Sequence, residues 1–188
     1  MRILICDPID REGIQRLIHE GFKVDVKYGI SSTKLKRIIK NYDAIIVRSR
    51  TKLTGEIIKL AGKLKVIGRA GSGLDNIDLK AAEDRGIAVL NTPKATATAV
   101  AELTFGLTLS LARKIPQADQ SMKEGRWLKR KFMGYQLRGK TIGIIGFGNI
   151  GLKTAYIAKG FGMKILIHTQ AHRQLKLKGK PQYSSRKR

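Results

Sequence analysis

Short apolar runs of strand length alternate with helical patterns from the first residues of the chain onward. The first helical pattern places Ile14, Leu17 and Ile18 on one face, and Gly21 follows it where a helix end favours a positive φ angle. Gly86 is expected to end a later helix, and Thr54 to cap a helix over residues 54–61. Strands separated by helices in this way are typical of βαβ units, which form parallel sheets covered by helices. The sequence therefore predicts an α/β fold, with strands at Arg2–Cys6, Phe22–Lys27, Ala44–Val47, Lys65–Ile67, Ile87–Leu90, Thr141–Ile145 and Lys164–Ile167.

The alternation pauses after residue 93 and resumes at residue 141. Between them we expect a long helix over about residues 96–114, a shorter one ending near residue 124, and a basic, aromatic stretch without a clear period. We therefore predict three parts: a first domain over residues 1–93, a second over residues 94–168, and a divergent basic tail over residues 169–188 that is disordered.

The strongest local motif is a G-x-G-x-x-G sequence over residues 146–151. It follows an apolar strand and opens a helix, which is the context that a dinucleotide-binding loop needs. Gly146 permits a tight turn, Gly148 lets the backbone approach a pyrophosphate, and Gly151 lets the helix and strand pack closely. A glycine-rich turn without a ligand is the alternative, and the position of the motif disfavours it.

A dinucleotide site of this kind normally has an acidic residue at the end of the next strand, where it holds the ribose hydroxyls. The strand in question ends in Ile167-His168-Thr169, and no Asp or Glu follows Glu124. A dinucleotide would thus bind through its phosphates without this ribose contact. His172 and Arg173 offer a weaker alternative, a site for the 2′-phosphate of NADP.

Two further loops lie where parallel sheets place their ligands, after strands. Residues 68–78 form a second glycine-rich loop, whose backbone N–H groups and Ser72 hydroxyl suit an anionic group, although a plain turn capped by Asp78 is equally compatible. Residues 48–50, Arg-Ser-Arg, follow another strand, and arginine there can grip a carboxylate or phosphate with two hydrogen bonds, although a solvated turn is the alternative.

Several other site classes are excluded. Residues 134–141 match the string of a phosphate-binding P-loop, but they lead into a strand, whereas a P-loop follows one. The three histidines and Cys6 show no metal-ligand spacing, so we expect no metal site. No nucleophile elbow of the G-x-S-x-G type occurs.

The charge of the chain suggests a rival function. The formal net charge is +24, and residues 125–188 carry 16 basic residues and no acidic residue. With Trp127, Phe132 and Tyr135 among these charges, a nucleic-acid-binding protein is the alternative hypothesis. We expect it to be wrong, because much of this stretch is explained by the resemblance described below.

Cysteine content and hydropathy bear on the compartment. The single cysteine, Cys6, lies in an apolar run, which predicts a buried thiol in a reducing, cytoplasmic setting. We expect no signal peptide, and no membrane span, because the most apolar stretch, residues 95–112, contains Glu102 and four threonines.

Taken together, these motifs resemble the D-2-hydroxyacid dehydrogenases, most closely the branch that oxidises 3-phosphoglycerate. The similarity runs from residue 1 to about His168, and many motifs occur in the same order. They are Cys6-Asp7-Pro8-Ile9, Ile46-Val47-Arg48-Ser49, residues 68–78, Asn91-Thr92-Pro93, residues 101–104, residues 131–134, residues 137–141 and residues 143–151.

The resemblance implies a flavodoxin-like substrate-binding domain followed by the start of a Rossmann nucleotide-binding domain, both incomplete in this chain. It implies an NAD-dependent oxidoreductase that oxidises the CH–OH group of a D-2-hydroxy acid, with 3-phosphoglycerate in L-serine biosynthesis as the expected substrate. It also implies a homodimer, formed by the long helix and the stretch over residues 125–139, and no nucleic-acid or membrane partner.

The resemblance also assigns roles to individual residues. Arg48 and Ser49 would face the phosphate end of the substrate, while Ala70 and Gly71 would offer backbone N–H groups to its carboxylate. Ser72 would approach the cofactor. The cofactor would also meet the glycine-rich loop, with Asn149 and Ile150 covering the NAD pyrophosphate beside Gly146, Gly148 and Gly151.

The chain departs from the family at its C-terminal end. The family normally has its ribose-binding Asp at the position of Thr169, and its catalytic Arg, Glu and His follow further downstream, so we predict no catalytic residue within this sequence. We hypothesise that the chain is a truncated or frame-shifted product of a dehydrogenase gene, inactive alone and weak in NAD binding.

Overall fold

The computed structural model describes residues 1–169, and these divide into two compact units, Met1–Thr96 and the part from Ala97 onward. Each unit is described by itself. The predicted basic tail lies outside the described residues, apart from Thr169.

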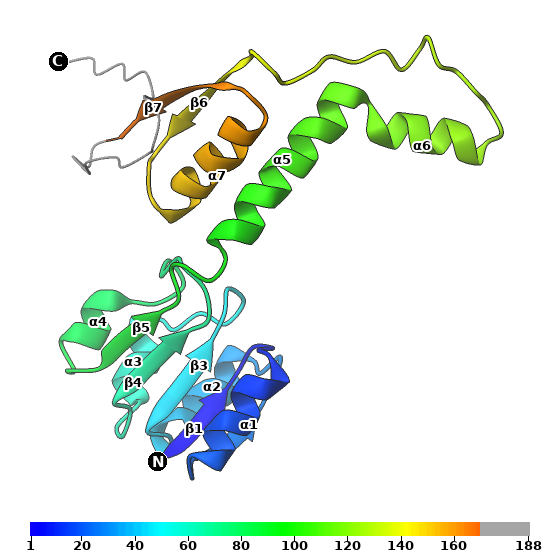
Figure 1. Cartoon of the computed structure of the whole chain (residues 1–188). Helices are drawn as coiled ribbons and strands as arrows, with labels where there is room; N and C mark the ends of the chain where they lie inside the picture. The colour runs from blue at the N-terminus through cyan, green and yellow to red at the C-terminus, as the bar shows by residue number, and fades with distance from the viewer. Residues whose placement is uncertain (170–188) are drawn as a thin grey trace. The chain divides into compact units, whose positions relative to one another are not determined.

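The first unit contains a parallel sheet of five strands in the order β2-β1-β3-β4-β5, the order of flavodoxin-like folds (Figure 1). Every neighbouring pair is parallel, so all carboxyl ends lie at one edge. The strands are β1 Arg2–Ile5, β2 Lys23–Val26, β3 Ala44–Val47, β4 Val66–Arg69 and β5 Ala88–Asn91.

Helices cover both faces of this sheet. On one face, Ile14 and Leu17 of α1 pack with Ile3 and Ile5 of β1. On the other face, α2, α3 and α4 contribute to the main core, whose members include Leu35, Ile58 and Ala82. The helices are α1 Arg11–His19, α2 Ser32–Ile38 with a 3₁₀ turn Ile39–Asn41, α3 Gly55–Leu60 and α4 Leu79–Glu83.

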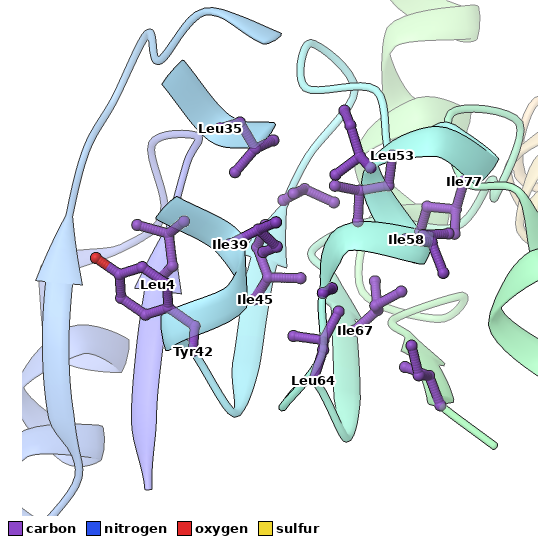
Figure 2. Packing of buried hydrophobic residues seen from close by; sticks show 14 of the residues in the cluster. Leu4, Leu35, Ile39, Tyr42, Ile45, Leu53, Ile58, Leu64, Ile67 and Ile77 are labelled. Carbon is purple, nitrogen blue, oxygen red and sulfur yellow. The ribbon is translucent and has the colours of Figure 1, made fainter. Parts of the chain in front are cut away.

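The main core follows from the strand sequences, which are apolar on both faces as buried parallel strands require. Leu4, Ile45 and Ile67, from three neighbouring strands, are fully buried and meet Leu35 and Ile58 from the covering helices (Figure 2). This contiguous packing makes the sheet a rigid support for the loops at its carboxyl edge.

The second unit begins with two helices, α5 Ala97–Arg113 and α6 Ile115–Lys123, followed by an irregular segment. A parallel pair of strands, β6 Thr141–Ile145 and β7 Lys164–His168, is then joined through α7 Asn149–Gly160. This is one βαβ unit of Rossmann type. Helix α5 packs on it, and the ring of Phe105 stacks on that of Phe161 with centroids 5.2 Å apart.

The structure confirms the α/β class, the parallel sheet and the predicted strands. It also confirms two helix ends, since Gly21 and Gly86 follow α1 and α4 with positive φ angles of 81° and 63°. One detail of the sequence interpretation is wrong. Thr54 occupies the position before α3, but its side chain makes no capping hydrogen bond, whereas that of Asp78 caps α4.

Candidate functional site

The segments that follow β1, β3, β4 and β5 all lie at the carboxyl edge of the five-stranded sheet. The strand order reverses between β1 and β3, and α/β sheets place their ligands at such a point. Asp7 follows β1 and Arg48 follows β3. Ala70 and Thr92 follow β4 and β5. The candidate substrate residues are therefore brought to one edge.

A buried carboxylate, that of Asp7, organises the loop after β3. Its Oδ2 accepts hydrogen bonds from the backbone N–H groups of Arg48 (2.7 Å) and Thr51 (3.1 Å). Its Oδ1 accepts from the Thr51 hydroxyl (2.8 Å) and from Nε of Arg50 (3.2 Å). With a side chain only 1% exposed, Asp7 is held by four donors from a loop that lies more than 40 positions away in sequence.

These donors decide the protonation of Asp7. Burial by itself raises the pKa of a carboxyl group, but the N–H groups of Arg48 and Thr51, the Thr51 hydroxyl and the Arg50 guanidinium outweigh it. The pKa of Asp7 is therefore lowered. The neighbouring Cys6 thiol is different, because burial, assisted by the Asp7 charge, raises its pKa to about 12. Cys6 is therefore a buried, protonated thiol without nucleophilic character.

Asn76 holds the same loop from its carbonyl side. Its Nδ2 donates to the carbonyl oxygens of Arg48 and Thr51, both at 2.7 Å. Its Oδ1 is buried and accepts no hydrogen bond within the described part of the chain. With N–H groups held by Asp7 and carbonyls held by Asn76, the backbone of residues 48–51 is fixed.

This fixed backbone presents Arg48 and Ser49 outward. Both side chains are exposed, and Arg48 is steadied by a hydrogen bond from its Nη1 to the Pro8 carbonyl (3.2 Å). A guanidinium on a rigid backbone at a strand's carboxyl end is well placed to grip an anionic group.

In the glycine-rich loop over residues 68–78, the N–H groups of Ala70 and Gly71 already donate to backbone carbonyls of the protein. That of Ala70 donates to the Val47 carbonyl (2.9 Å), and that of Gly71 donates to the Arg69 carbonyl (2.8 Å). The prediction that these two groups bind a carboxylate stays a prediction, and it requires both bonds to open. Ser72 is exposed, as its predicted role needs.

The segment after β5 is tied to this loop. Asn91 Nδ2 donates to the Ser72 carbonyl (2.8 Å), and the Thr92 N–H group donates to the Gly71 carbonyl (2.9 Å). A cavity of about 380 Å³ opens beside these residues, against α1. It is lined mainly by apolar groups and backbone, among them Leu17, Ile46, Gly68, Arg69, Ala70, Leu90, Asn91 and Thr92.

In the second unit, the three motif glycines occupy three different environments. Gly146 has φ +90°, and its N–H group donates to the His168 carbonyl (2.8 Å), which closes the turn after β6. A side chain at Gly151 would collide with the Gly146 carbonyl and crowd Ile144 Cγ2 at 3.2 Å. A side chain at Gly148 would meet nothing within 4 Å.

The motif therefore separates into structural and open positions. Gly146 and Gly151 are required by the turn and by the packing of α7, as the sequence interpretation states. Gly148 has no such requirement in the protein, and its open surroundings fit a backbone that a ligand approaches. Asn149, Ile150 and Gly151 form the first turn of α7, the end of a helix that suits an anionic group.

The end of β7 carries no acidic group. His168 is its last residue and Thr169 follows, at the position that the resemblance assigns to a ribose-binding Asp. The alternative 2′-phosphate residues, His172 and Arg173, lie outside the described residues.

The structure of residues 1–169 can be compared with the expectations for a P-loop, a metal site and a membrane span. Residues 134–141 lead into β6, so the P-loop string begins a strand. Within this range no group of three or more His, Cys, Asp or Glu side chains gathers as a metal site would require. No helix among these residues has the length and apolar character needed to cross a membrane.

Sequence reasoning assigned no role to Asp7 or Asn76. A usable signal exists for Asp7, a carboxylate directly after an apolar strand at the carboxyl edge of a parallel sheet. For Asn76 no local signal exists, because its partners lie 25 to 28 positions earlier in the chain.

Comparisons with known proteins agree on one family. A sequence profile of the catalytic domain of D-isomer specific 2-hydroxyacid dehydrogenases matches residues 3–182. The chain is 48% identical over 168 residues to D-3-phosphoglycerate dehydrogenase of Archaeoglobus fulgidus, which covers 89% of this chain and 32% of that protein. It is 46% identical over 170 residues to hydroxypyruvate reductase of Thermotoga maritima, covering 90% and 56% of the two chains.

A solved structure extends the agreement to the fold. The NAD⁺-bound 3-phosphoglycerate dehydrogenase of Entamoeba histolytica superposes with a TM-score of 0.75 and 33% identity, covering 94% of this chain and 57% of that one. The chain thus spans about a third of the length of the archaeal relative and about half of the other two.

The hydrogen bonds of Asp7 yield a stability prediction. Asp7→Ala leaves buried donors of the loop unpaired and is expected to lower the free energy of unfolding by about 3 kcal/mol. Asp7→Asn keeps one acceptor oxygen for the N–H groups of Arg48 and Thr51 and is expected to cost about 1 kcal/mol. Urea unfolding at pH 7 measures both. Asp84→Asn, on an exposed ion pair, serves as the control and should change little.

The same variants give a pH test. Because the pKa of Asp7 is lowered in the folded protein, its contribution is present above the ordinary carboxyl value of about 4 and is lost as the pH falls through the lowered value. The wild type should therefore lose more stability than Asp7→Asn on acidification. Equal losses in the two proteins would contradict the assigned role of Asp7.

Proposed function

This chain belongs to the D-isomer specific 2-hydroxyacid dehydrogenase family, and from that premise we propose that it carries the substrate-facing and NAD-binding loops of a D-3-phosphoglycerate dehydrogenase. The observation that carries the proposal is the open position at Gly148 in a strand–loop–helix motif, in a chain 48% identical to a D-3-phosphoglycerate dehydrogenase. The oxidised group is the CH–OH of a D-2-hydroxy acid, and the expected pathway is L-serine biosynthesis.

The loop over residues 146–151 fits NAD in shape and in chemistry. The open space at Gly148 admits a pyrophosphate, and the N–H groups of Ile150 and Gly151 in the first turn of α7 suit its negative charge. We propose Gly146, Gly148, Asn149, Ile150 and Gly151 as the cofactor-binding residues of this unit. Ser72 of the first unit is proposed as a further cofactor contact.

The substrate would meet the carboxyl edge of the first unit. Arg48 and Ser49 are proposed to hold its phosphate, because both are exposed on a backbone that Asp7 and Asn76 fix. Ala70 and Gly71 are proposed to hold its carboxylate, once their N–H groups leave the carbonyls of Val47 and Arg69.

NAD, when bound, would accept the hydride from the alcohol carbon. The protein must supply a base for the hydroxyl proton and a cation for the carboxylate. Within residues 1–169 the two histidines are His19, exposed on α1, and His168, at the end of β7. His19 ends α1 at the amino edge of the sheet, opposite the edge that carries Arg48 and Ser49, and His168 belongs to the second unit. We propose that this chain binds NAD but does not oxidise 3-phosphoglycerate alone.

We propose a homodimer for the second unit, and a cytoplasmic location for the protein. Leu103, Leu107 and Leu111 recur at helical spacing on α5 and are 62%, 63% and 77% exposed. A row of leucines this exposed is typical of an interface.

The reduced, buried Cys6 suits a reducing compartment. The net charge does not favour a nucleic-acid partner, because most of the described chain, including its basic residues, matches the dehydrogenase family.

Gly148→Ala tests the cofactor proposal. The added methyl group meets no protein atom within 4 Å, so the melting temperature should not change, but it enters the space of the pyrophosphate. The dissociation constant for NAD, measured by calorimetry, should rise about tenfold. Gly160→Ala, at the other end of α7 and equally open, is the matched control. The purified chain should form no NADH from 3-phosphoglycerate. Turnover, or equal NAD affinity in the two variants, would contradict the proposal.

Thr169→Asp tests the missing ribose contact. A carboxylate at this position accepts charge-assisted hydrogen bonds from the ribose hydroxyls, and such a bond contributes about 1.5–3 kcal/mol. The variant should therefore bind NAD about tenfold more tightly than the wild type. Thr169→Asn, uncharged and similar in size, should gain less. NADP binding should not improve, because a carboxylate repels the 2′-phosphate. Unchanged NAD affinity would argue against a dinucleotide at the end of β7.

Leu107→Glu tests the dimer. Sedimentation should give twice the chain mass for the wild type and the single-chain mass for the variant, because a charge at a buried interface is costly. Leu79→Glu places the same change on a leucine of α4 that is 46% exposed, and it should leave the dimer intact. A monomeric wild type would contradict the homodimer.

A further inference from the structure

A second cavity of the first unit has a different character from the one beside Leu17 and Leu90. It has a volume of about 450 Å³ and lies between the end of β2 and the start of α2. Its lining consists of Lys27, Tyr28, Gly29, Ile30, Ser31, Lys34, Arg37 and Ile38. None of the residues proposed for substrate or NAD belongs to this lining.

The lining holds three cationic side chains and no acidic one. Lys27 enters from the end of β2, and Lys34 and Arg37 project from one helix, one turn apart. The nearest acidic residue on β2 is Asp25, which is paired with Arg2 through a hydrogen bond of 2.7 Å and whose charge also attracts Lys27. Lys36, on the same helix, is paired with Glu56, whereas none of the three lining cations forms an ion pair within residues 1–169.

The walls of this cavity are held by backbone hydrogen bonds. Lys27 N–H donates to the Ile5 carbonyl (2.8 Å), and Ile30 N–H donates to the Lys27 carbonyl (3.3 Å). Gly29 closes the turn between them with φ +77°. Ser31 Oγ accepts from Lys34 N–H (3.3 Å), which leaves its hydroxyl hydrogen to donate elsewhere. Three like charges are thus gathered on a rigid frame, an arrangement that costs repulsion unless an anion neutralises it.

From this cavity we infer a binding site for a small polyanion, a phosphorylated or polycarboxylate molecule with two or more negative charges. Lys27, Lys34 and Arg37 would neutralise it, the Ser31 hydroxyl would donate to it, and Ile30, Ile38 and the Tyr28 ring would contact its carbon skeleton. The volume lies within the range of about 300–1,000 Å³ typical of small-molecule sites. A nucleic-acid strand instead needs a track of cations that continues beyond one cavity.

This site is independent of the proposed dehydrogenase activity. It does not include Arg48, and it borders the other loop only at Gly29, where an added Cβ would lie 3.6 Å from Arg50 Nη1. Arg50 is in turn bonded to Asp7. A bound polyanion therefore lies next to one of the four donors that hold the loop after β3, without occupying the substrate position.

Calorimetric titration of the full chain with inorganic pyrophosphate at low ionic strength tests the site. The titration is repeated with Gly148→Ala, which separates this site from the glycine-rich loop of the second unit. One binding event common to both proteins is expected, with a dissociation constant of about 0.1 mM. The double variant Lys34→Ala/Arg37→Ala should weaken it about tenfold or more. The matched control, Lys59→Ala/Lys63→Ala, removes two exposed cations just before β4, at the opposite edge of the sheet, and should stay within about twofold of the wild type. Melting curves establish that each variant is folded.

Four outcomes would overturn the inference. One is the absence of saturable binding, and another is an equal loss of affinity in both double variants, which would indicate diffuse attraction to a basic protein. The third is competition by a short single-stranded RNA that binds more tightly and depends on the same residues. Loss of pyrophosphate binding in Arg48→Ala would also overturn it, by placing the probe at the substrate loop. Unchanged NAD affinity in Gly148→Ala would contradict only the proposed function.

Discussion

One buried carboxylate connects the core of the first unit to its functional edge. Asp7 comes directly after β1, and its four hydrogen bonds all go to the loop after β3. The two strands are neighbours in the sheet, so the carboxylate bridges the point where the strand order reverses. Burial of an ionised group is costly unless donors surround it, and the loop supplies them. Stability and loop geometry are therefore two consequences of one set of bonds.

Asn76 completes the same arrangement from a third segment. Because its amide donates to carbonyls on the same loop, the chain after β4 cannot move without releasing residues 48–51. The loop after β4 is linked in turn to the end of β5 through Asn91 and Thr92. The two loops that carry the candidate substrate residues and the segment after β5 thus form one hydrogen-bonded edge. Such mutual support is what a site needs if an anion is to be held at a defined position.

Periodicity and glycine positions were enough to predict much of this molecule, because both act locally. The strands, the helix ends at Gly21 and Gly86, and the separate duties of Gly146 and Gly151 follow from backbone geometry near each residue. Hydrogen bonds between distant segments could not be predicted in this way. Ala70 and Gly71 look like free donors in the sequence, yet a neighbouring strand end and a tight turn already use their N–H groups. Asn76 gives no local sign of its two partners.

The charge of the chain is better understood residue by residue than as a total. Some cations have structural partners, such as Arg2 with Asp25 and Arg50 with Asp7, and the partner carboxylate offsets their charge. Arg48 is exposed on a fixed backbone, and Lys27, Lys34 and Arg37 line one cavity without an acidic neighbour in its lining. A long polyanion responds to total charge, but a small one responds to charges that converge. Within the first unit three cations converge on one cavity and Arg48 stands apart on the loop after β3, which favours small anions as the ligands of this fold.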